Sequence, residues 1–253
     1  MASDSDGSKT RTGVMNFTAT NDSQVVATGI PQIDSTSGTI CLWVRTTDGT
    51  LPGPGTDASM ILDRRETGGS GSGTVLVLQN DGTVYFQANP SGANPFGSSS
   101  AINDGIWHHI AVTYGQNVGD QVTMYIDGVY NAASSNVKAW WWPAGMNVLL
   151  GKSRDAYWKR LDGKLDDVRF YTRILTEAEI GQVMSGTVVD AAALKMRMDF
   201  TTGPANGFRL TNTPVPGTIQ GSTSVLGTYL DLGASPYFHV PTGGVQFFRA
   251  RVP

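Results

Sequence analysis

Two stretches determine the fold of this chain: Asp104-Gly-Ile-Trp-His-His-Ile-Ala-Val-Thr-Tyr114 and Val122-Thr-Met-Tyr-Ile-Asp-Gly128. A short polar segment joins them. Apolar residues recur at every second position in both stretches, which predicts strands with one buried face. The two series are Ile110, Val112, Tyr114 and Val122, Met124, Ile126. The polar segment predicts that the strands form a hairpin, and Asp127-Gly128 is a strong turn signal at its end. Trp107 breaks the alternation, so we expect a bulge or a strand start near His108.

These stretches resemble the central hairpin of laminin-G-like domains. Such domains belong to the concanavalin A-like lectin/glucanase jelly rolls, to which pentraxins are related. Two further motifs match the family in the same order, Leu149-Leu-Gly-Lys-Ser153 and the closing segment from Leu161 to Ile180. The resemblance implies an all-β fold, a two-sheet antiparallel jelly-roll sandwich of the concanavalin A-like type. It also implies a binding module, although a fold alone does not fix a function.

The composition narrows the classes of partner. The chain has 253 residues, a net charge of −3 and 15% charged residues, which gives no electrostatic case for binding nucleic acid or an anionic membrane. Its 31 glycines fit many short strands joined by tight turns. The single cysteine, Cys41, excludes an internal disulfide, and we expect it to be a buried thiol in an apolar strand. No apolar run is long enough to span a membrane.

Composition and motif content divide the chain into three parts. Residues 1–13 are polar and predict a flexible leader. Residues 14–190 carry the jelly-roll motifs. Residues 191–253 predict a small C-terminal β-module, and its independent folding is left open because about 60 residues is marginal for a lone domain. No signal peptide is visible. The family resemblance implies a secreted or cell-surface protein, cut from or attached to a larger one.

Other segments give clear local signals. Gly38–Thr46 is apolar at both odd and even positions, which predicts a strand between two layers. Residues 74–88 predict a second hairpin around the turn Asn80-Asp81-Gly82. Residues 89–103 predict a long polar loop in which Phe96 is an exposed ring.

The carboxylate pattern argues against a glycoside hydrolase. Glucanases of this fold use an E-x-D-x-x-E strand, with one carboxylate as nucleophile and another as acid/base. The chain has only three glutamates and no such pattern. Glu66 lies in a glycine-rich loop. Glu177 and Glu179 lie in a capping-box segment that opens at Thr176 and predicts a short helix ending near Gly186.

Two adjacent pairs of polar residues also lack catalytic geometry. Asp166 and Asp167 would face opposite sides of a strand, so we expect a turn role and an ion pair with Arg169 instead of cooperation. His108 and His109 diverge in the same way, which favours structural packing over a shared metal ion. The strings typical of polysaccharide lyases of this fold are absent. We therefore expect the chain not to be an enzyme.

Calcium is the cofactor that the family resemblance suggests. Laminin-G-like domains often hold a structural calcium near the first strands and the closing segment, where Asp22 and Asp166 are the nearest matches. Pentraxins bind calcium through two loops, whose carboxylates here would be Asp63, Glu66 and Asp155, although the pentraxin strings are missing. Calcium takes six to eight oxygens, several of them from backbone carbonyls, so the sequence can nominate only the carboxylates.

A concentration of aromatic residues points to a ligand. These residues lie in or beside two loops around the strand predicted at 147–151, and they are Trp140, Trp141, Trp142, Tyr157 and Trp158. Sugar rings present apolar C–H faces that stack on exposed aromatic rings. We predict a platform made by Trp158, Tyr157 and one of Trp140 or Trp142, with Arg154 and Asp155 bonding the hydroxyls. The alternative is that the rings are core, and at least one of the three consecutive tryptophans is expected to be buried.

The sequence thus predicts a non-catalytic carbohydrate-binding module that binds a poly- or oligosaccharide through exposed aromatic rings. One alternative is a protein–protein adhesion or structural module of an extracellular or virion-surface assembly. A second alternative is a polysaccharide-degrading enzyme whose catalytic residues follow no recognised pattern.

Overall fold

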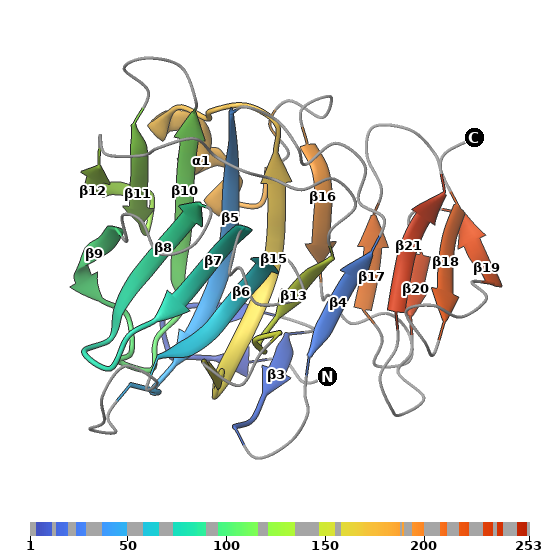
Figure 1. The fold of residues 1–253 in the computed structure, drawn as a ribbon, viewed down its shortest axis with the longest axis horizontal. Coiled ribbons are helices and arrows are strands. Elements are labelled where there is room, and N and C mark those ends of the chain that lie inside the picture. The colour runs from blue at the N-terminus through green and yellow to red at the C-terminus, as the bar shows by residue number, and fades with distance from the viewer. Residues whose placement is uncertain are drawn as a thin grey trace.

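Two β-sheets packed face to face make up the body of the protein (Figure 1). The structure is a computed structural model. It describes residues 4–11, 14–19, 24–28, 37–49, 58–65, 73–89, 96–115, 121–134, 147–154, 158–187, 189, 194–199, 208–211, 218–222, 230–234, 237–239 and 247–251. The predicted two-sheet sandwich of mainly antiparallel strands is confirmed.

The back sheet is the layer farther from the viewer in Figure 1. Its strands follow the order β12 (Val129–Ser134), β11 (Val122–Ile126), β10 (His108–Gly115), β5 (Ser37–Thr46), β15 (Gly163–Tyr171), β16 (Leu194–Asp199), β17 (Phe208–Thr211) and β20 (Tyr237–His239). A short strand, β3 (Met15–Phe17), also pairs with β15.

The front sheet lies over the back sheet and carries the remaining long strands (Figure 1). Its order is β19 (Leu230–Ala234), β18 (Thr218–Ser222), β21 (Phe247–Arg251), β4 (Val25–Thr28), β13 (Val148–Leu150), β6 (Ser59–Arg65), β7 (Gly73–Leu78), β8 (Thr83–Asn89) and β9 (Phe96–Ala101). The two-residue strand β14 (Lys159–Arg160) pairs in parallel with β6.

The hairpin of β10 and β11 forms as predicted. Ile110 lies opposite Ile126, and both side chains belong to the core between the sheets. Strand β10 begins at His108, directly after the break in alternation at Trp107. Asp127 and Gly128 have φ values of 54° and 80°, the left-handed conformation that a two-residue turn between twisted strands requires.

Alternate residues of facing strands fill the space between the sheets. Leu42 and Ile110 from the back sheet pack with Leu62, Leu76 and Phe86 from the front sheet, and each is at most 2% exposed. Burying one such side chain contributes about 1.5–3 kcal/mol relative to leaving it in water. This core fixes the register of both sheets, and it leaves the other face of each strand free to carry a different layer.

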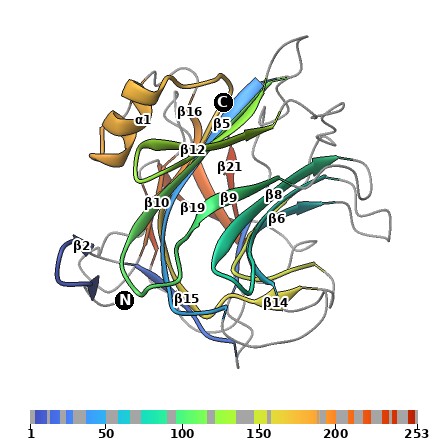
Figure 2. The ribbon, with the colours of Figure 1, turned by 90° about the vertical axis from the view of Figure 1, so that its left-hand side faces the viewer.

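Helix α1 (Glu177–Met184) supplies that second layer on the back sheet (Figure 2). Its Ile180 and Val183 pack on Cys41 and Ala111, which face outward from the sandwich and are fully buried. The helix starts at the predicted capping box, in which the Thr176 side chain accepts a hydrogen bond from the third helical residue. The layer explains why the strand around Cys41 is apolar on both faces. Within the described residues no helix has the length and apolar character needed to cross a bilayer.

The buried thiol predicted at Cys41 is confirmed. Burial raises the pKa of this thiol to about 12, against a smaller opposing effect of the buried Arg169. A thiol that stays protonated is a poor nucleophile and a poor metal ligand, so Cys41 acts as a small core residue.

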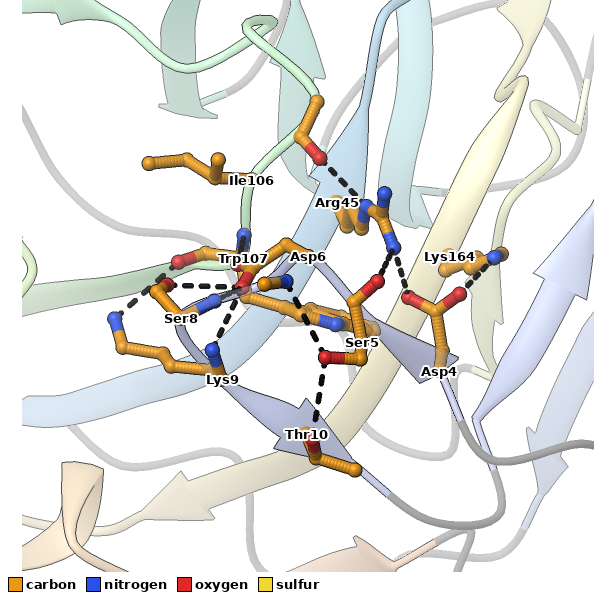
Figure 3. Close-up of polar contacts among 12 residues, drawn as sticks. Asp4, Ser5, Asp6, Ser8, Lys9, Thr10, Arg45, Ile106, Trp107 and Lys164 are labelled. Carbon is orange, nitrogen blue, oxygen red and sulfur yellow. Dashed lines mark hydrogen bonds and ion pairs between the residues drawn. The ribbon is translucent and has the colours of Figure 1, made fainter.

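Residues 4–11 form a hairpin of β1 (Asp4–Ser5) and β2 (Thr10–Arg11), on the same side of the molecule as α1 (Figure 2). Residues 4–11 of the predicted flexible leader thus form a two-stranded hairpin. The Asp4 carboxylate accepts hydrogen bonds from Arg45 Nη1 at 2.6 Å and from Lys164 Nζ (Figure 3). The Asp6 carboxylate accepts the backbone N–H of Trp107 at 2.6 Å. Ionic contacts, which leave no apolar pattern in a sequence, hold this hairpin.

One other expectation needs correction. The long loop predicted for residues 89–103 contains strand β9, and the predicted exposed ring of Phe96 is only 8% exposed and lies in the core. The C-terminal strands continue the two sheets: β16 pairs with β15, and β21 pairs in parallel with β4. Pairing satisfies edge N–H and C=O groups that would otherwise face solvent. The boundary near residue 190 is thus not a break in the sheets, and independent folding of residues 191–253 stays a prediction.

Candidate functional site

A hollow of about 340 Å³ lies on the outer face of the front sheet, the face turned away from α1. Among the described residues, Ala58 and Val77 form its apolar floor, Tyr85 and Trp158 supply aromatic rings, and Gln79, Asn80 and Asp81 supply polar groups. This size and this mixture of apolar and polar groups are typical of small-molecule sites.

Strand alternation places one of the rings. Val84 and Phe86 flank Tyr85 in β8, and both point into the sandwich core. Tyr85 therefore points outward. Its strand partner in β7 is Val77, which also faces outward and belongs to a small cluster under the hollow. The outward face of β7 is therefore apolar, and the ring of Tyr85 lies beside it on β8.

Trp158 reaches the same surface from a distant part of the chain. The residue after it, Lys159, donates its backbone N–H to the carbonyl of Ala58 at 3.0 Å, which ties the segment to β6. The ring of Trp158 lies 6.4 Å from that of Tyr85, centroid to centroid, at an interplanar angle of 43°. Both residues are partly exposed. The two rings can therefore contact each other and still offer area to a ligand.

The polar groups come from the tight turn between β7 and β8, the Asp-Gly turn that the sequence predicted. The backbone N–H of Gly82 donates to the backbone carbonyl of Gln79 at 2.9 Å. The backbone N–H of Gln79 donates to the backbone carbonyl of Thr83 at 2.8 Å. Gly82 has a φ of 80°, and a Cβ there would lie 2.0 Å from the Asn103 side chain. Only glycine fits this position, so the turn has a fixed shape.

Asp81 has a fixed orientation within the turn. Its Oδ1 accepts hydrogen bonds from the backbone N–H of Thr83 at 2.9 Å and from the Thr83 hydroxyl at 2.6 Å. These bonds lower the pKa of Asp81, and the bond from the Thr83 hydroxyl has the largest effect. Desolvation raises the pKa by a smaller amount. The side chain is exposed, so it presents a charged carboxylate at the edge of the hollow.

Two of the predicted ligand residues, Trp158 and Arg154, lie in the described part of the chain, and the structure places them in different surroundings. Trp158 lines the hollow. Arg154 does not, because its backbone N–H donates to the buried carboxylate of Asp63 at 2.9 Å and its Nε lies 3.6 Å from the same group. Its Nη2 donates to the carbonyl of Asn147. Burial lowers the pKa of Arg154, against the attraction of Asp63. Arg154 is a structural partner of Asp63 and is not among the described residues that line the hollow.

The other predicted ligand residues, Trp140, Trp142, Asp155 and Tyr157, lie outside the described residues. The sequence reasoning missed Tyr85 and the polar turn at residues 79–81. A signal was present, because Tyr85 has the opposite parity to its apolar neighbours in a strand that begins directly after an Asp-Gly turn.

Asp166 and Asp63, the candidate calcium ligands that lie in the described part of the chain, are both bonded to arginines. Asp166 Oδ2 accepts a hydrogen bond from Arg11 Nε at 2.5 Å. Its Oδ1 accepts a hydrogen bond from the backbone N–H of Asp167 at 2.8 Å. Asp63 is fully buried between Arg65 and Arg154. Its Oδ2 accepts a hydrogen bond from Arg65 Nη2 at 2.7 Å. Within the described part of the chain no three metal-ligating side chains come together. Asp22, Glu66 and Asp155 lie outside that part. Calcium binding stays a prediction, to be tested by melting curves with EDTA and with added calcium.

The adjacent histidines and aspartates have structural partners, as expected. His109 is buried with its ring 5.3 Å from that of Trp43, while His108 bonds carboxylates at the other side of the strand. Asp167 forms the expected ion pair with Arg169, at 2.8 and 2.6 Å. Its φ of 48° marks the irregularity in β15 that lets it turn toward this partner.

Among curated proteins, the rat "Sushi, von Willebrand factor type A, EGF and pentraxin domain-containing protein 1" is 29% identical over 120 residues. The match covers 46% of this chain and only 3% of that protein. The chain therefore corresponds to a small part of this relative.

Solved structures share the fold at low identity. The native heptameric SAP-like pentraxin of Limulus polyphemus gives a TM-score of 0.51 at 17% identity, over 69% of this chain and 82% of that one. The Ruminococcus gnavus IT-sialidase CBM40 bound to α2,3 sialyllactose gives 0.52 at 14% identity, over 68% and 96%. The family model described as the concanavalin A-like lectin/glucanases superfamily matches residues 19–181, more than half of the chain. The protein belongs to the concanavalin A-like lectin/glucanase superfamily.

Proposed function

We propose that this protein is a non-catalytic carbohydrate-binding module and that the hollow on the front sheet holds the sugar. The observation that carries the proposal is the meeting of Tyr85 and Trp158, from distant segments, over an apolar floor beside a rigid polar turn. A pyranose ring has apolar C–H faces that stack on such rings and hydroxyls that the amide and carboxylate groups of residues 79–81 can bond.

The relatives support the proposal at the level of the fold. A sialidase carbohydrate-binding module with the same fold is reported bound to sialyllactose. The rat relative is much longer than this chain and combines several kinds of domain. We accordingly propose a module of a larger, secreted or cell-surface protein, with a poly- or oligosaccharide as its partner.

The non-catalytic part of the proposal rests on the carboxylates. The chain lacks the E-x-D-x-x-E strand of the glucanases, and its adjacent Asp166 and Asp167 are each held by an arginine. Incubation of the purified protein with laminarin, alginate and xylan is expected to release no reducing ends and no unsaturated products. Turnover that a single carboxylate substitution abolishes would overturn this part.

The binding part is tested on a glycan array followed by titration calorimetry. Trp158→Ala and Tyr85→Ala should each weaken binding by about 1–3 kcal/mol, the size of a stacking contact between a ring and an aromatic side chain. Tyr130→Ala is the matched control, because Tyr130 is 56% exposed on β12 at the edge of the back sheet. Melting curves of all three variants should stay close to wild type. A wild-type protein that binds no glycan refutes the proposal, as does a control variant that loses as much binding as the other two.

A protein–protein adhesion module is the second candidate function. The observation that favours it is a pair of exposed apolar side chains on edge strand β12, Val129 at 63% and Tyr130 at 56%. An empty glycan array combined with self-association that Tyr130→Asp abolishes, measured by analytical ultracentrifugation, would favour this candidate over the first.

A further inference from the structure

The described lining of the hollow carries a negative charge. Among its described lining residues Asp81 is the one that carries a charge, and the others are apolar, amide or phenolic. The two groups that hold the Asp81 carboxylate, the backbone N–H and the hydroxyl of Thr83, are both neutral. No cation neutralises this carboxylate within the described part of the chain, unlike Asp63 and Asp166.

The charge lies close enough to act on any bound ring. A hollow of about 340 Å³ has room for a sugar ring. A charged substituent on that ring therefore comes within the screening length of Asp81, which is about 8 Å at physiological ionic strength. Because the turn fixes the carboxylate, it cannot swing away from an anionic ligand at no cost, as a side chain without these bonds could.

We propose that the hollow selects its sugar by charge, with Asp81 favouring rings that carry an amine over neutral rings and disfavouring rings that carry a carboxylate. The inference rests on the proposed function, since it concerns the same hollow. An amine can donate to the free oxygen of the carboxylate as an ion pair, a hydroxyl can donate as a neutral hydrogen bond, and an acidic group is repelled.

The test compares three oligosaccharides of equal length with one backbone geometry: β1,4-linked glucosamine, glucose and glucuronate. The same three forms of other hexoses on the array extend the comparison. For wild type at low salt, affinity should fall by about fivefold at each step from amine to neutral to acid. In about 0.5 M salt the steps should shrink toward no difference, because screening removes the charge effect and leaves the stacking.

Asp81→Asn is the decisive variant, because the amide oxygen can still accept both hydrogen bonds from Thr83 while the charge is gone. It should keep the affinity for the neutral sugar and lose the ranking by charge. Glu177→Gln is the matched control, since it removes one exposed carboxylate on α1, away from the hollow, and should keep the ranking.

The outcomes separate this inference from the proposed function. A wild-type protein that binds no sugar refutes both. Binding with no ranking by charge, or a ranking that survives in Asp81→Asn, refutes the charge selection and leaves the sugar site in place. Equal loss of all three ligands in Asp81→Asn would mean that Asp81 acts through neutral hydrogen bonds and would also overturn the inference. If Asp81→Asn fails to fold, the salt dependence of the wild-type ranking decides the matter.

Discussion

Two aromatic clusters lie on opposite outer faces of the sandwich, and they differ in what covers them. On the back sheet Trp43 and Trp107 form the covered cluster, with exposed fractions of 4% and 1%. On the front sheet Tyr85 and Trp158 form the open cluster, which is partly exposed and borders the hollow. Both clusters face outward from the sandwich core. The type of ring therefore does not distinguish a packed residue from one that can bind a ligand.

The cover over the back cluster is the N-terminal hairpin. Lys9 Nζ lies 4.6 Å and Arg11 Cζ 4.5 Å from the centroid of the Trp43 ring. Cations over an aromatic face attract it by about 0.5–2 kcal/mol, depending on desolvation. The hairpin precedes the residues that match the family, which begin at residue 19. A segment outside the family match thus decides that one outward-facing cluster is core, while the other stays available to a ligand.

The largest expected difference between the clusters is in stability. Trp107→Ala should lower the free energy of unfolding by about 3–5 kcal/mol, because it empties a fully covered site. Trp158→Ala should lower it by less than about 1.5 kcal/mol, because its ring is partly exposed. Urea unfolding followed by circular dichroism measures both, and Trp107→Phe serves as the milder control. Equal losses for the two alanine variants would mean that the front cluster is core as well.

The second prediction concerns acid. His109 packs against Trp43 in the covered cluster, and burial lowers the pKa of His109 to about 3. The unfolded chain takes up the proton near pH 6.5, while the folded chain does not, so stability is full above that pH and falls as the pH drops. The loss should reach about 2 kcal/mol at about pH 5.

His109→Phe keeps a ring against Trp43 and removes the titration. Its free energy of unfolding should therefore fall less than that of wild type between about pH 7 and about pH 5. Equal losses in the two proteins would assign the acid sensitivity to carboxylates instead. The open cluster offers a second comparison, because Trp158→Ala should not change the size of the loss.

The elements with a regular apolar period could be predicted from the sequence. The hairpin of β10 and β11 and the strand around Cys41 alternate in a way that only a buried face requires, and the capping box at Thr176 locates α1. The N-terminal hairpin could not be predicted this way. Its partners, Arg45 and Lys164, lie far away in sequence, and ionic contacts impose no period on the polar residues that make them.

The candidate site was predictable only in part, for a related reason. Trp158 stood out as a ring in a charged loop, and it does line the hollow. Arg154, in the same loop, is expected from the sequence to bond the ligand, but the structure pairs it with Asp63, which an apolar strand carries into the interior. Tyr85 was missed because it lies in a strand and not in a loop. Partners across a sheet depend on register, which local sequence does not reveal.

The third prediction removes part of the cover. Arg11→Ala takes the guanidinium away from Trp43 and leaves the buried carboxylate of Asp166 without its cation. The expected loss is about 1.5 kcal/mol, the size of a hydrogen bond to a charged group. Acrylamide should also quench tryptophan fluorescence more strongly. The double variant Arg11→Ala/Asp166→Asn should recover part of the stability. Unchanged quenching would show that the hairpin covers the ring without Arg11.

The smallest effect concerns His108, the neighbour of His109 with the opposite response to pH. Its Nδ1 lies 2.7 Å from Asp127 and its Nε2 lies 3.1 Å from Asp104. The hydrogen bond with Asp127 raises the pKa of His108 against the effect of desolvation, and Asp104 adds to the rise. The folded chain therefore holds the proton more tightly than the unfolded chain. This contribution to stability is full below about pH 6.5 and is lost as the pH rises through the raised pKa.

The loss should stay below about 1 kcal/mol, because the carboxylates are partly exposed and solvent screens the pair. Thermal unfolding of wild type and His108→Gln between about pH 6 and about pH 9 measures it as the difference between the two proteins. The folded chain keeps His109 neutral over this range, and the contribution of His109 near the lower limit is the same in both proteins, so it cancels in the comparison. A decline with rising pH that persists in His108→Gln would assign it to another group. Two adjacent histidines with opposite pH responses would show that burial against Trp43, and not the residue type, sets the sign in the covered cluster.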